Sequence, residues 1–467
     1  MRKLFSLVVL SVLFSSASFA QNQTLIKGMV SEIEVTTDST SLNYSIYIPQ
    51  NYTATKPAKG LFVFDPNGDG VRAARLFVSA IAGEDYVVVS NNFKMSNNLD
   101  SLDYNANNAI TIMRDVFAKV SLESSQVYIA GLGAGAKATS ALSYLLKNTA
   151  GILLVDDVYF ADQYFTQARR NTVIGVVGKS SPNYYQMADY FRMMKSIDSF
   201  NELYTYSNSG EWPGANFIGI LINRLSHFQG ENINLKNPDS LWEKQYVNDL
   251  NGLKSLASNK ELLTAYDLSQ DLKRDYRGEV DLDAIKDFYK DLRKTEPYKI
   301  AKRLDRSGNL EELLLLDDIE YFLESDIVAA NFENLGYWDS RINEFKIASK
   351  DAAKQNEEKV AKRMLGYIDY TVEDFLTLNK VSLLPQRIFG NVLMTMLDSK
   401  DYQAYINIIS LSAQDNDDNT AYFYLEELLK QGFTDYDALY EIPQTTTLKI
   451  KPIYNQLIKK YLGKSKF

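Results

Sequence analysis

Three glycines at alternate positions stand where an apolar stretch gives way to a helical one, in residues 126–147, QVYIAGLGAGAKATSALSYLLK. Residues 127–130 are typical of a buried strand, and residues 136–146, rich in Ala and Leu, are typical of a helix. A strand that turns sharply into a helix through Gly-x-Ser-x-Gly exposes a serine hydroxyl that can attack a carbonyl carbon. The middle residue here is Gly133, which has no side chain. The spacing indicates acyl-transfer geometry, but the nucleophile is missing.

The elements that would position this turn alternate along residues 25–230. Apolar runs typical of strands covered on both faces are separated by helical patterns, and one alternating pair, 25–36 with 43–48, is typical of an antiparallel edge. We therefore predict the α/β class: a three-layer sandwich with a mostly parallel sheet. The further predicted strands are 61–64, 86–90, 127–130, 152–155, 173–177 and 203–206, and the predicted helices are 71–82, 103–120, 136–147, 184–197 and 216–228.

The composition changes near residue 231. Charged residues number 34 of 210 in residues 21–230 but 73 of 237 in residues 231–467, while Gly falls from 15 to 8. This shift indicates an α/β domain, 21–230, followed by an all-helical domain, 231–467. Helical spacing is clear at residues 421–429, which Gly432 should end, and at residues 313–322, where we predict a helix after Ser307-Gly308-Asn309.

Residues 43–230 resemble the α/β-hydrolase superfamily, in particular its esterase and depolymerase-like branch. Four stretches carry the resemblance in the order that the family shows: Tyr44–Pro49 with Tyr52, Phe64–Gly70, Gly131–Gly135 and Gly210–Pro213. The resemblance implies an oxyanion loop at the second stretch, a nucleophile at the third and a histidine base at the fourth. The end of the chain, residues 415–462, resembles the terminal unit of tetratricopeptide-type arrays, and residues 239–411 are tetratricopeptide-like by analogy.

The triad that the resemblance implies is degenerate. Gly133 stands at the nucleophile position and Gly210 at the base position, and the loop after residue 178, where the acid would lie, carries Ser180 and no carboxylate. The only histidine, His227, falls in a predicted helix beyond that loop, so a Ser–His mechanism has no base. The resemblance still implies a pocket above the strands, with candidate oxyanion-like or lining residues Asp65, Asn67, Gly68, Gly70, Ala134 and Trp212. Trp212 could instead plug the base of the last helix of this domain.

Other chemistry is weaker. Gly131-x-Gly133-x-x-Ala136 also fits a dinucleotide fingerprint, with Asp156 or Asp157 as the ribose acid, but this unit lies in the middle of the predicted sheet rather than at its start. Asp65, Asn67 and Asp69 alternate as in a calcium loop, but Leu76 stands where the closing Glu should be. We therefore predict no cofactor and no metal.

The amino terminus predicts export. Arg2 and Lys3 precede an apolar core at residues 4–14, and Ser18-Phe19-Ala20 fits a cleavage site, so residues 1–20 are expected to be a signal peptide. No later apolar run is long enough for a transmembrane segment, and without any Cys there is no lipobox. We expect a periplasmic or extracellular protein. Its net charge of −9 does not favour nucleic acid as a partner.

Two functional hypotheses follow. The first is a secreted pseudoenzyme that binds an unknown protein, peptide or glycan-like ligand through the pocket or through the helical domain, which could equally be a cap over the first domain. The second is an active serine hydrolase or esterase with a non-standard nucleophile, such as Ser180 or Ser140. The residues favour the non-catalytic hypothesis.

Overall fold

The structure is a computed structural model, and it describes residues 25–36, 41–81, 84–98, 101–146, 149–160, 172–197, 200–228, 239–351, 353–378 and 383–467. The predicted signal peptide, 1–20, and the predicted domain boundary between 230 and 231 lie outside these residues, so both stay predictions.

The described strands form one eight-stranded sheet in the order β1-β2-β4-β3-β5-β6-β7-β8. From β4 to β8 all neighbours pair in parallel, with Ile129 of β5 beside Ile152 of β6, whereas β2 runs antiparallel to both β1 and β4. This is the mostly parallel sheet and antiparallel edge that the sequence predicts. The strands are β1 (Val30–Thr36), β2 (Ser41–Tyr47), β3 (Ala58–Phe64), β4 (Tyr86–Asn91), β5 (Leu122–Leu132), β6 (Thr149–Val155), β7 (Thr172–Gly178) and β8 (Asn201–Tyr206).

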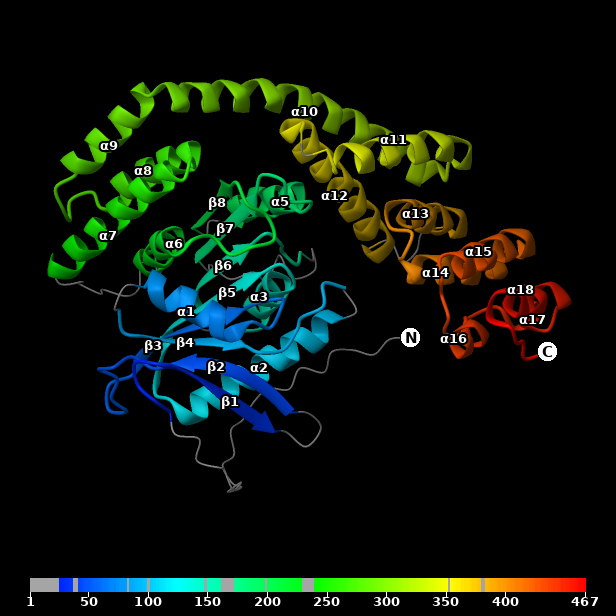
Figure 1. The fold of residues 1–467 in the computed structure, drawn as a ribbon, viewed down its shortest axis with the longest axis horizontal. Helices are drawn as coiled ribbons and strands as arrows, with labels where there is room; N and C mark the ends of the chain where they lie inside the picture. The colour runs from blue at the N-terminus through cyan, green and yellow to red at the C-terminus, as the bar shows by residue number, and fades with distance from the viewer. Residues whose placement is uncertain are drawn as a thin grey trace.

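Helices cover both faces of the sheet, because successive residues of the buried strands point to opposite sides. Leu61 and Tyr128 face one apolar core, which α1 and α6 cover, whereas Phe62 and Ile129 face the other, which α2 and α3 cover together with α5 farther along the sheet. The three-layer sandwich is thereby confirmed (Figure 1). These helices are α1 (Gly70–Ala80), α2 (Leu102–Lys119), α3 (Ala134–Leu145), α5 (Tyr184–Met194) and α6 (Ala215–His227).

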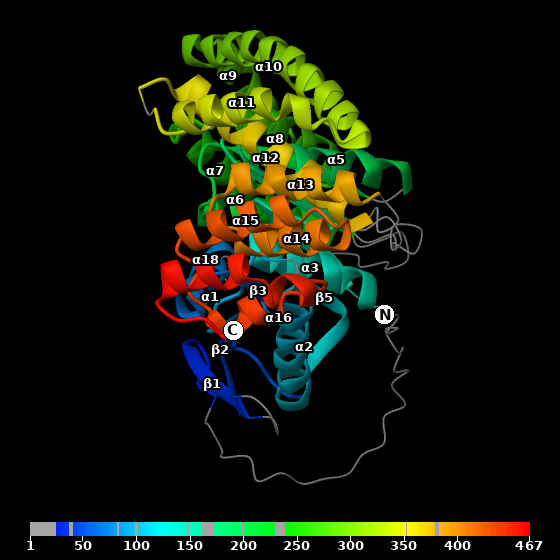
Figure 2. The same cartoon turned by 90° about the vertical axis from the view of Figure 1, so that its right-hand side faces the viewer.

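The second half of the described chain is helical, as predicted. α7, α8 and α9 lie beside the sheet, α10 arches over them, and α11 to α15 pack each against the next (Figures 1 and 2). The helices are α7 (Asp239–Ser258), α8 (Leu262–Asp275), α9 (Asp283–Lys294), α10 (Glu296–Ala329), α11 (Leu335–Ala348), α12 (Gln355–Leu378), α13 (Leu384–Leu397), α14 (Tyr402–Gln414), α15 (Asp418–Lys430), α16 (Tyr436–Glu441), α17 (Thr446–Lys449) and α18 (Pro452–Leu462). In the described part of the chain, no helix combines the length and the apolar composition needed to cross a membrane.

One apolar core joins the sheet to the first helices of this second half. The buried Arg224 of α6 strengthens the joint: its Nε donates to Asp275 Oδ2 of α8 at 2.6 Å, and Phe200 and Phe228 flank its guanidinium. Because an unpaired buried charge is costly, this ion pair holds α8 in place beside α6. α7 and α8 are therefore packed onto the α/β part.

One helix differs from the expectation. Ser307-Gly308-Asn309 predicted a helix that starts after residue 309, but α10 runs without interruption from Glu296 to Ala329. Its start is fixed elsewhere, because Thr295 caps the amide of Tyr298 and Pro297 occupies the first turn. A strong start and packing along α10 outweigh the weak helix propensity of Ser, Gly and Asn.

Candidate functional site

The turn at Gly133 has the backbone of a nucleophile elbow. β5 ends at Leu132, α3 begins at Ala134, and Gly133 between them has φ +52° and ψ −122°. An L-residue adopts such angles only under strain, and nucleophile elbows impose that strain on their serine. A Cβ atom built on Gly133 would lie 3.9 Å from Pro66 Cγ, its nearest neighbour. The site has the space for a side chain that this chain does not supply.

Gly131 and Gly135, which flank Gly133, must be glycines for a different reason, namely the lack of space for a side chain. A Cβ on Gly131 would lie 2.2 Å from the carbonyl oxygen of Gly135, and a Cβ on Gly135 would lie 2.0 Å from that of Phe64. Both distances are far below van der Waals contact, so these two positions require glycine for the turn to close. The elbow is therefore a closely packed structure, and only its central position is free to carry another residue.

The loop between β3 and α1 is organised around Asp65. Asp65 Oδ1 accepts hydrogen bonds from the amides of Asn67, at 2.9 Å, and Asp69, at 3.4 Å, and its own amide donates to Asn91 Oδ1. The oxyanion loop predicted for these residues would leave such amides free to face a ligand. Here two of them donate to a carboxylate of the same loop. Asn67 is exposed, while Gly68 and Gly70 lie against the loop after β4, at Phe93 and Asn91.

Trp212 connects the loop after β8 to the loop after β3. Its Nε1 donates to Asp65 Oδ2 at 2.8 Å, and its ring meets Phe77 of α1 edge to face. Because β8 and β3 are separated by β5, β6 and β7 in the sheet, the loop after β8 reaches back across the carboxyl ends of these strands. Trp212 packs against the core, as a plug would, and also closes the loop around Asp65.

Asp156 lies at the corner where the sequence predicted the acid of a triad, but it comes from another strand. It follows β6, with φ +60°, and its Oδ1 accepts from the Gly178 amide at 2.5 Å while its Oδ2 accepts from the Gly210 amide. Burial raises the pKa of Asp156, and the two amide donors partly oppose that rise. The sequence search looked for an acid in the loop after β7, where Ser180 stands, yet a carboxylate reaches the same corner from the neighbouring strand.

His227 lies far from the elbow. It ends α6, where Phe228 O accepts from Thr172 at the start of β7. His227 therefore lies near the amino ends of the parallel strands, whereas Gly133 lies at their carboxyl ends. The ring bonds to Gln245 at 2.9 Å and contacts Trp242, and burial lowers the pKa of His227 to about 4. Because His227 lies at the other end of the strands from Gly133, its imidazole cannot serve as a base for a group at the elbow.

Helix α12 crosses the carboxyl edge of the sheet. Arg363 Nη1 donates to the Lys179 carbonyl at 2.8 Å, and a Cβ on Gly366 would lie 1.9 Å from the Pro182 carbonyl oxygen, so helix and loop touch through backbone. Arg363 also pairs with Glu312 of α10. The helical half thus docks on the loop after β7, beside the position predicted for the acid.

Lys137 and Asp157 form a buried ion pair beside the elbow. Lys137 Nζ lies 3.8 Å from Asp157 Oδ2, and Asp157 is fully buried. Burial raises the pKa of Asp157 to about 7, against the opposing effect of Lys137, and the charge of Glu373 on α12 raises it further. Two candidate ribose-binding acids, Asp156 and Asp157, therefore bind groups of the protein itself. In the described ranges no cluster of three or more His, Cys, Asp or Glu side chains is arranged to hold a metal.

A recess of about 650 Å³ lies between the loops after β7 and β8 and α12. It places the predicted acid position, Ser180, close to the residues that flank the predicted base position, Gly210. Its lining is rich in hydroxyl, amide and charged groups: Ser180, Pro182, Ser207, Asn208, Ser209, Glu211, Lys362 and Leu365. This recess is formed by both halves of the chain, so sequence reasoning on the first half alone missed Lys362 and Leu365.

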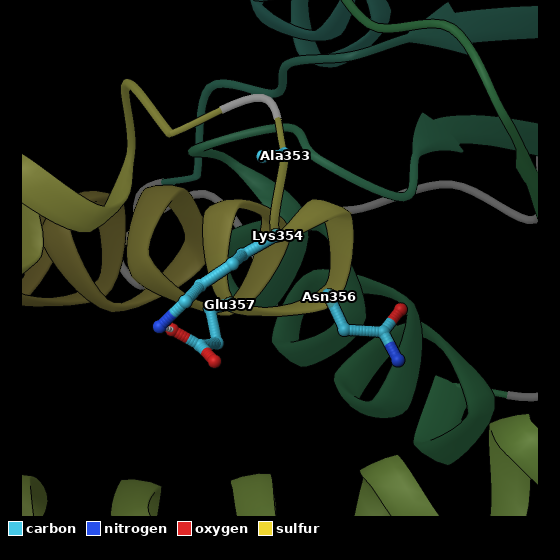
Figure 3. A pocket seen from close by; sticks show the side chains of 4 residues that line it. All are labelled: Ala353, Lys354, Asn356 and Glu357. Carbon is cyan, nitrogen blue, oxygen red and sulfur yellow. Dashed lines mark hydrogen bonds and ion pairs between the residues drawn. The ribbon is translucent and has the colours of Figure 1, made fainter.

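A second hollow, of about 420 Å³, opens at the start of α12 around Ala353, Lys354, Asn356 and Glu357. Lys354 Nζ bonds to Glu357 Oε2 at 3.0 Å, and Asn356 points away from this pair (Figure 3). Both side chains of the Lys354–Glu357 ion pair are exposed, and such pairs contribute little to stability. It lacks the convergent polar groups of the recess beside Ser180.

No protein-family model matches the chain, and no curated protein matches it. Among solved structures, a thermostable esterase is similar at 12% identity and TM-score 0.35, over 42% of this chain and 61% of the esterase. A ferulic acid esterase is similar at 9% identity and TM-score 0.35, over 43% of this chain and 98% of that esterase. A mutant of the feruloyl esterase module of Clostridium thermocellum, complexed with sinapinate, is similar at 12% identity and TM-score 0.34. The match covers 45% of this chain and 92% of that module. These values mark a distant likeness of fold. The present chain joins its mostly parallel sheet to a long helical region.

Proposed function

We propose that this protein is a secreted, non-catalytic α/β-hydrolase-fold protein that binds a ligand or a protein partner. The observation that carries the proposal is Gly133: it keeps the elbow backbone and the open space of a nucleophile but has no side chain. The other groups of a triad are also engaged elsewhere. Asp156 accepts from two backbone amides, and His227 is buried at the other end of the strands. Catalysis by a Ser–His–acid triad needs all three groups in one hydrogen-bonded line.

The recess beside Ser180 is the proposed binding site. Hydroxyls from three serines, the Asn208 amide and the charges of Glu211 and Lys362 offer both donors and acceptors, while Leu365 supplies an apolar wall. Such a lining suits a polar ligand with several hydroxyl or amide groups, so a glycan-like ligand or a short peptide fits better than a lipid. The volume of about 650 Å³ is in the range of small-molecule sites.

A binding screen tests this site. Wild-type protein is screened by thermal shift against xylo-oligosaccharides, cello-oligosaccharides and tetrapeptides, and every hit is measured by calorimetry. Leu365→Trp should fill the recess and abolish binding. Leu383→Trp, at an exposed position outside the recess, should leave binding unchanged. Hits that bind Leu365→Trp as well as wild type would place the ligand elsewhere and refute this site.

The alternative, a hydrolase with a non-standard nucleophile, is kept for Ser180 because its side chain lines the recess. Ser140 is less suitable: it is buried, donates to the Ala136 carbonyl and accepts from the Tyr159 amide at 2.7 Å. A fluorophosphonate probe separates the two functions, because it labels only an activated serine. We expect no labelled serine, and a single label on Ser180 would favour the alternative.

A further inference from the structure

One face of α10 is apolar and exposed. Leu310 is 64% exposed, Leu314 59% and Tyr321 70%, and Val328 continues the same line. Their spacings of four and seven residues place them on one side of the helix. α10 forms the arch at the top of Figure 1. Single exposed leucines are ordinary on a protein surface, but four large apolar side chains along one line of a helix, interrupted only by the exposed Asp317 and Glu324, favour an interaction surface.

The charges of α10 are divided along its length. Its first part carries Lys299, Lys302, Arg303 and Arg306, and lines a hollow of about 590 Å³ together with Arg293 and Tyr298. The remainder carries Glu311, Glu312, Asp317, Asp318, Glu320, Glu324 and Asp326, and residues 307–329 contain no Lys or Arg. This order opposes the helix dipole, which favours acids near the amino end and bases near the carboxyl end. Glu312 and Asp326 are buried and bind Arg363 and Trp338 of the same chain, whereas Asp318 and Glu324 are exposed. The exposed charges therefore need a reason outside the isolated helix.

We propose that α10 pairs antiparallel with α10 of a second copy of this chain, with the two-fold axis between Leu310 and Leu314. In that arrangement Leu310 of one copy faces Leu314 of the other, and Arg306 faces Asp318. Lys299 comes close to Glu324. Because the axis is two-fold, each such contact occurs twice, as in the isologous interfaces of most dimers. A second copy complements the basic part, the apolar stripe and the acidic part at once, whereas an anionic ligand would engage the basic part only.

Charge reversal tests the pairing. Lys299→Glu/Arg306→Glu places acids opposite Asp318 and Glu324 of the partner, and Asp318→Lys/Glu324→Lys places bases opposite Lys299 and Arg306. Each variant should therefore repel itself and attract the other. All four residues are exposed, so the variants should fold as wild type does. Lys286→Glu/Lys290→Glu on α9 is the matched control, since it makes the same change of charge away from the stripe.

Sedimentation velocity on the full chain, from about 1 to about 100 µM, gives the readout. We expect wild type and the α9 control to reach twice the 53.0 kDa of the single chain, or of its processed form, and to dissociate more readily in about 1 M salt. Each reversed variant should dimerise at least about tenfold more weakly, and an equimolar mixture should form the heterodimer. Wild type that stays monomeric throughout, or reversed variants that dimerise as wild type does, would overturn the proposal.

The direction of pairing has its own test, because the chain contains no Cys. Leu310→Cys and Leu314→Cys, mixed under oxidising conditions, should form the mixed disulfide faster than either variant forms its own. Preferred disulfides between identical positions would indicate parallel helices and overturn the antiparallel pairing. Monomeric wild type that is retained on immobilised heparin, with loss of retention in Lys299→Glu/Arg306→Glu, would assign the basic part to a polyanion instead.

Discussion

The Asp156 carboxylate accepts a hydrogen bond from the backbone amide of Gly210, so an acid from the end of β6 holds the loop in which a hydrolase would carry its base. The same carboxylate accepts from the Gly178 amide at 2.5 Å, which joins the loops after β7 and β8 at one corner. Asp156 therefore has a structural role, because its carboxylate ties the loops after β7 and β8 together.

Asp156→Asn should destabilise the protein by about 2 kcal/mol, because hydrogen bonds to a charged acceptor contribute about 1.5–3 kcal/mol and the new amide would oppose one N–H donor. Urea unfolding followed by circular dichroism measures the change. Glu211→Gln, in the same loop but exposed, is the control and should stay within about 0.5 kcal/mol. Equal effects of the two substitutions would contradict a structural role for the Asp156 carboxylate.

The elbow makes a prediction about two neighbouring glycines. Gly133→Ala should yield a folded protein that is destabilised by about 1–3 kcal/mol, since only its positive φ opposes a side chain. Gly131→Ala should cost more than about 4 kcal/mol or prevent folding, because its Cβ would meet the backbone of Gly135. The two variants are compared by soluble yield and by urea midpoint. A Gly131→Ala variant as stable as Gly133→Ala would refute the close packing of this turn.

Asp157 should give the protein a pH-dependent stability. Its pKa in the folded state, about 7, lies above that of an unfolded aspartate, so the folded protein binds more protons between about pH 4 and pH 7. Stability should therefore fall as the pH rises through this window, by at most about 1.4 kcal/mol per pH unit from this one group. Asp157→Asn should weaken the dependence of stability on pH, which is measured as urea midpoints at several pH values. A variant curve parallel to that of wild type would show that Asp157 does not carry the effect.

The contact between Trp212 and Asp65 can be separated from packing. Trp212→Phe removes the indole N–H but keeps a ring against Phe77, so it should cost about 1–3 kcal/mol, including the loss of a donor to a carboxylate. Trp212→Ala should cost about 3–5 kcal/mol because it also removes the ring. Thermal unfolding compares the two with wild type. A Trp212→Phe variant as stable as wild type would mean that the hydrogen bond contributes nothing measurable.

Much of the fold could be predicted from local pattern. Continuous apolar runs identify β3 to β7 because both faces of the central part of those strands are buried, and Gly131-x-Gly133-x-Gly135 identifies the elbow because backbone groups meet there. Gly432 follows α15, as its position predicted. These features depend on neighbours in the sequence, which a single sequence displays.

The rest depends on residues that are distant in the sequence. Asp156 meets Gly210 only because β6, β7 and β8 are neighbours in the sheet, and Trp212 meets Asp65 across 147 positions. The recess needs α12 to cross the loop after β7, which neither periodicity nor composition reveals. The turn-like Ser307-Gly308-Asn309 misled for the opposite reason, since packing and capping override a local preference in α10.

The central claim is that this protein performs no acyl transfer, and the most direct measurement is ester hydrolysis by the purified protein. Wild type and Ser180→Ala are assayed with p-nitrophenyl acetate and butyrate against a buffer blank. We expect no rate above the blank for either protein. A wild-type rate that follows the protein through a second purification and disappears in Ser180→Ala would contradict the claim.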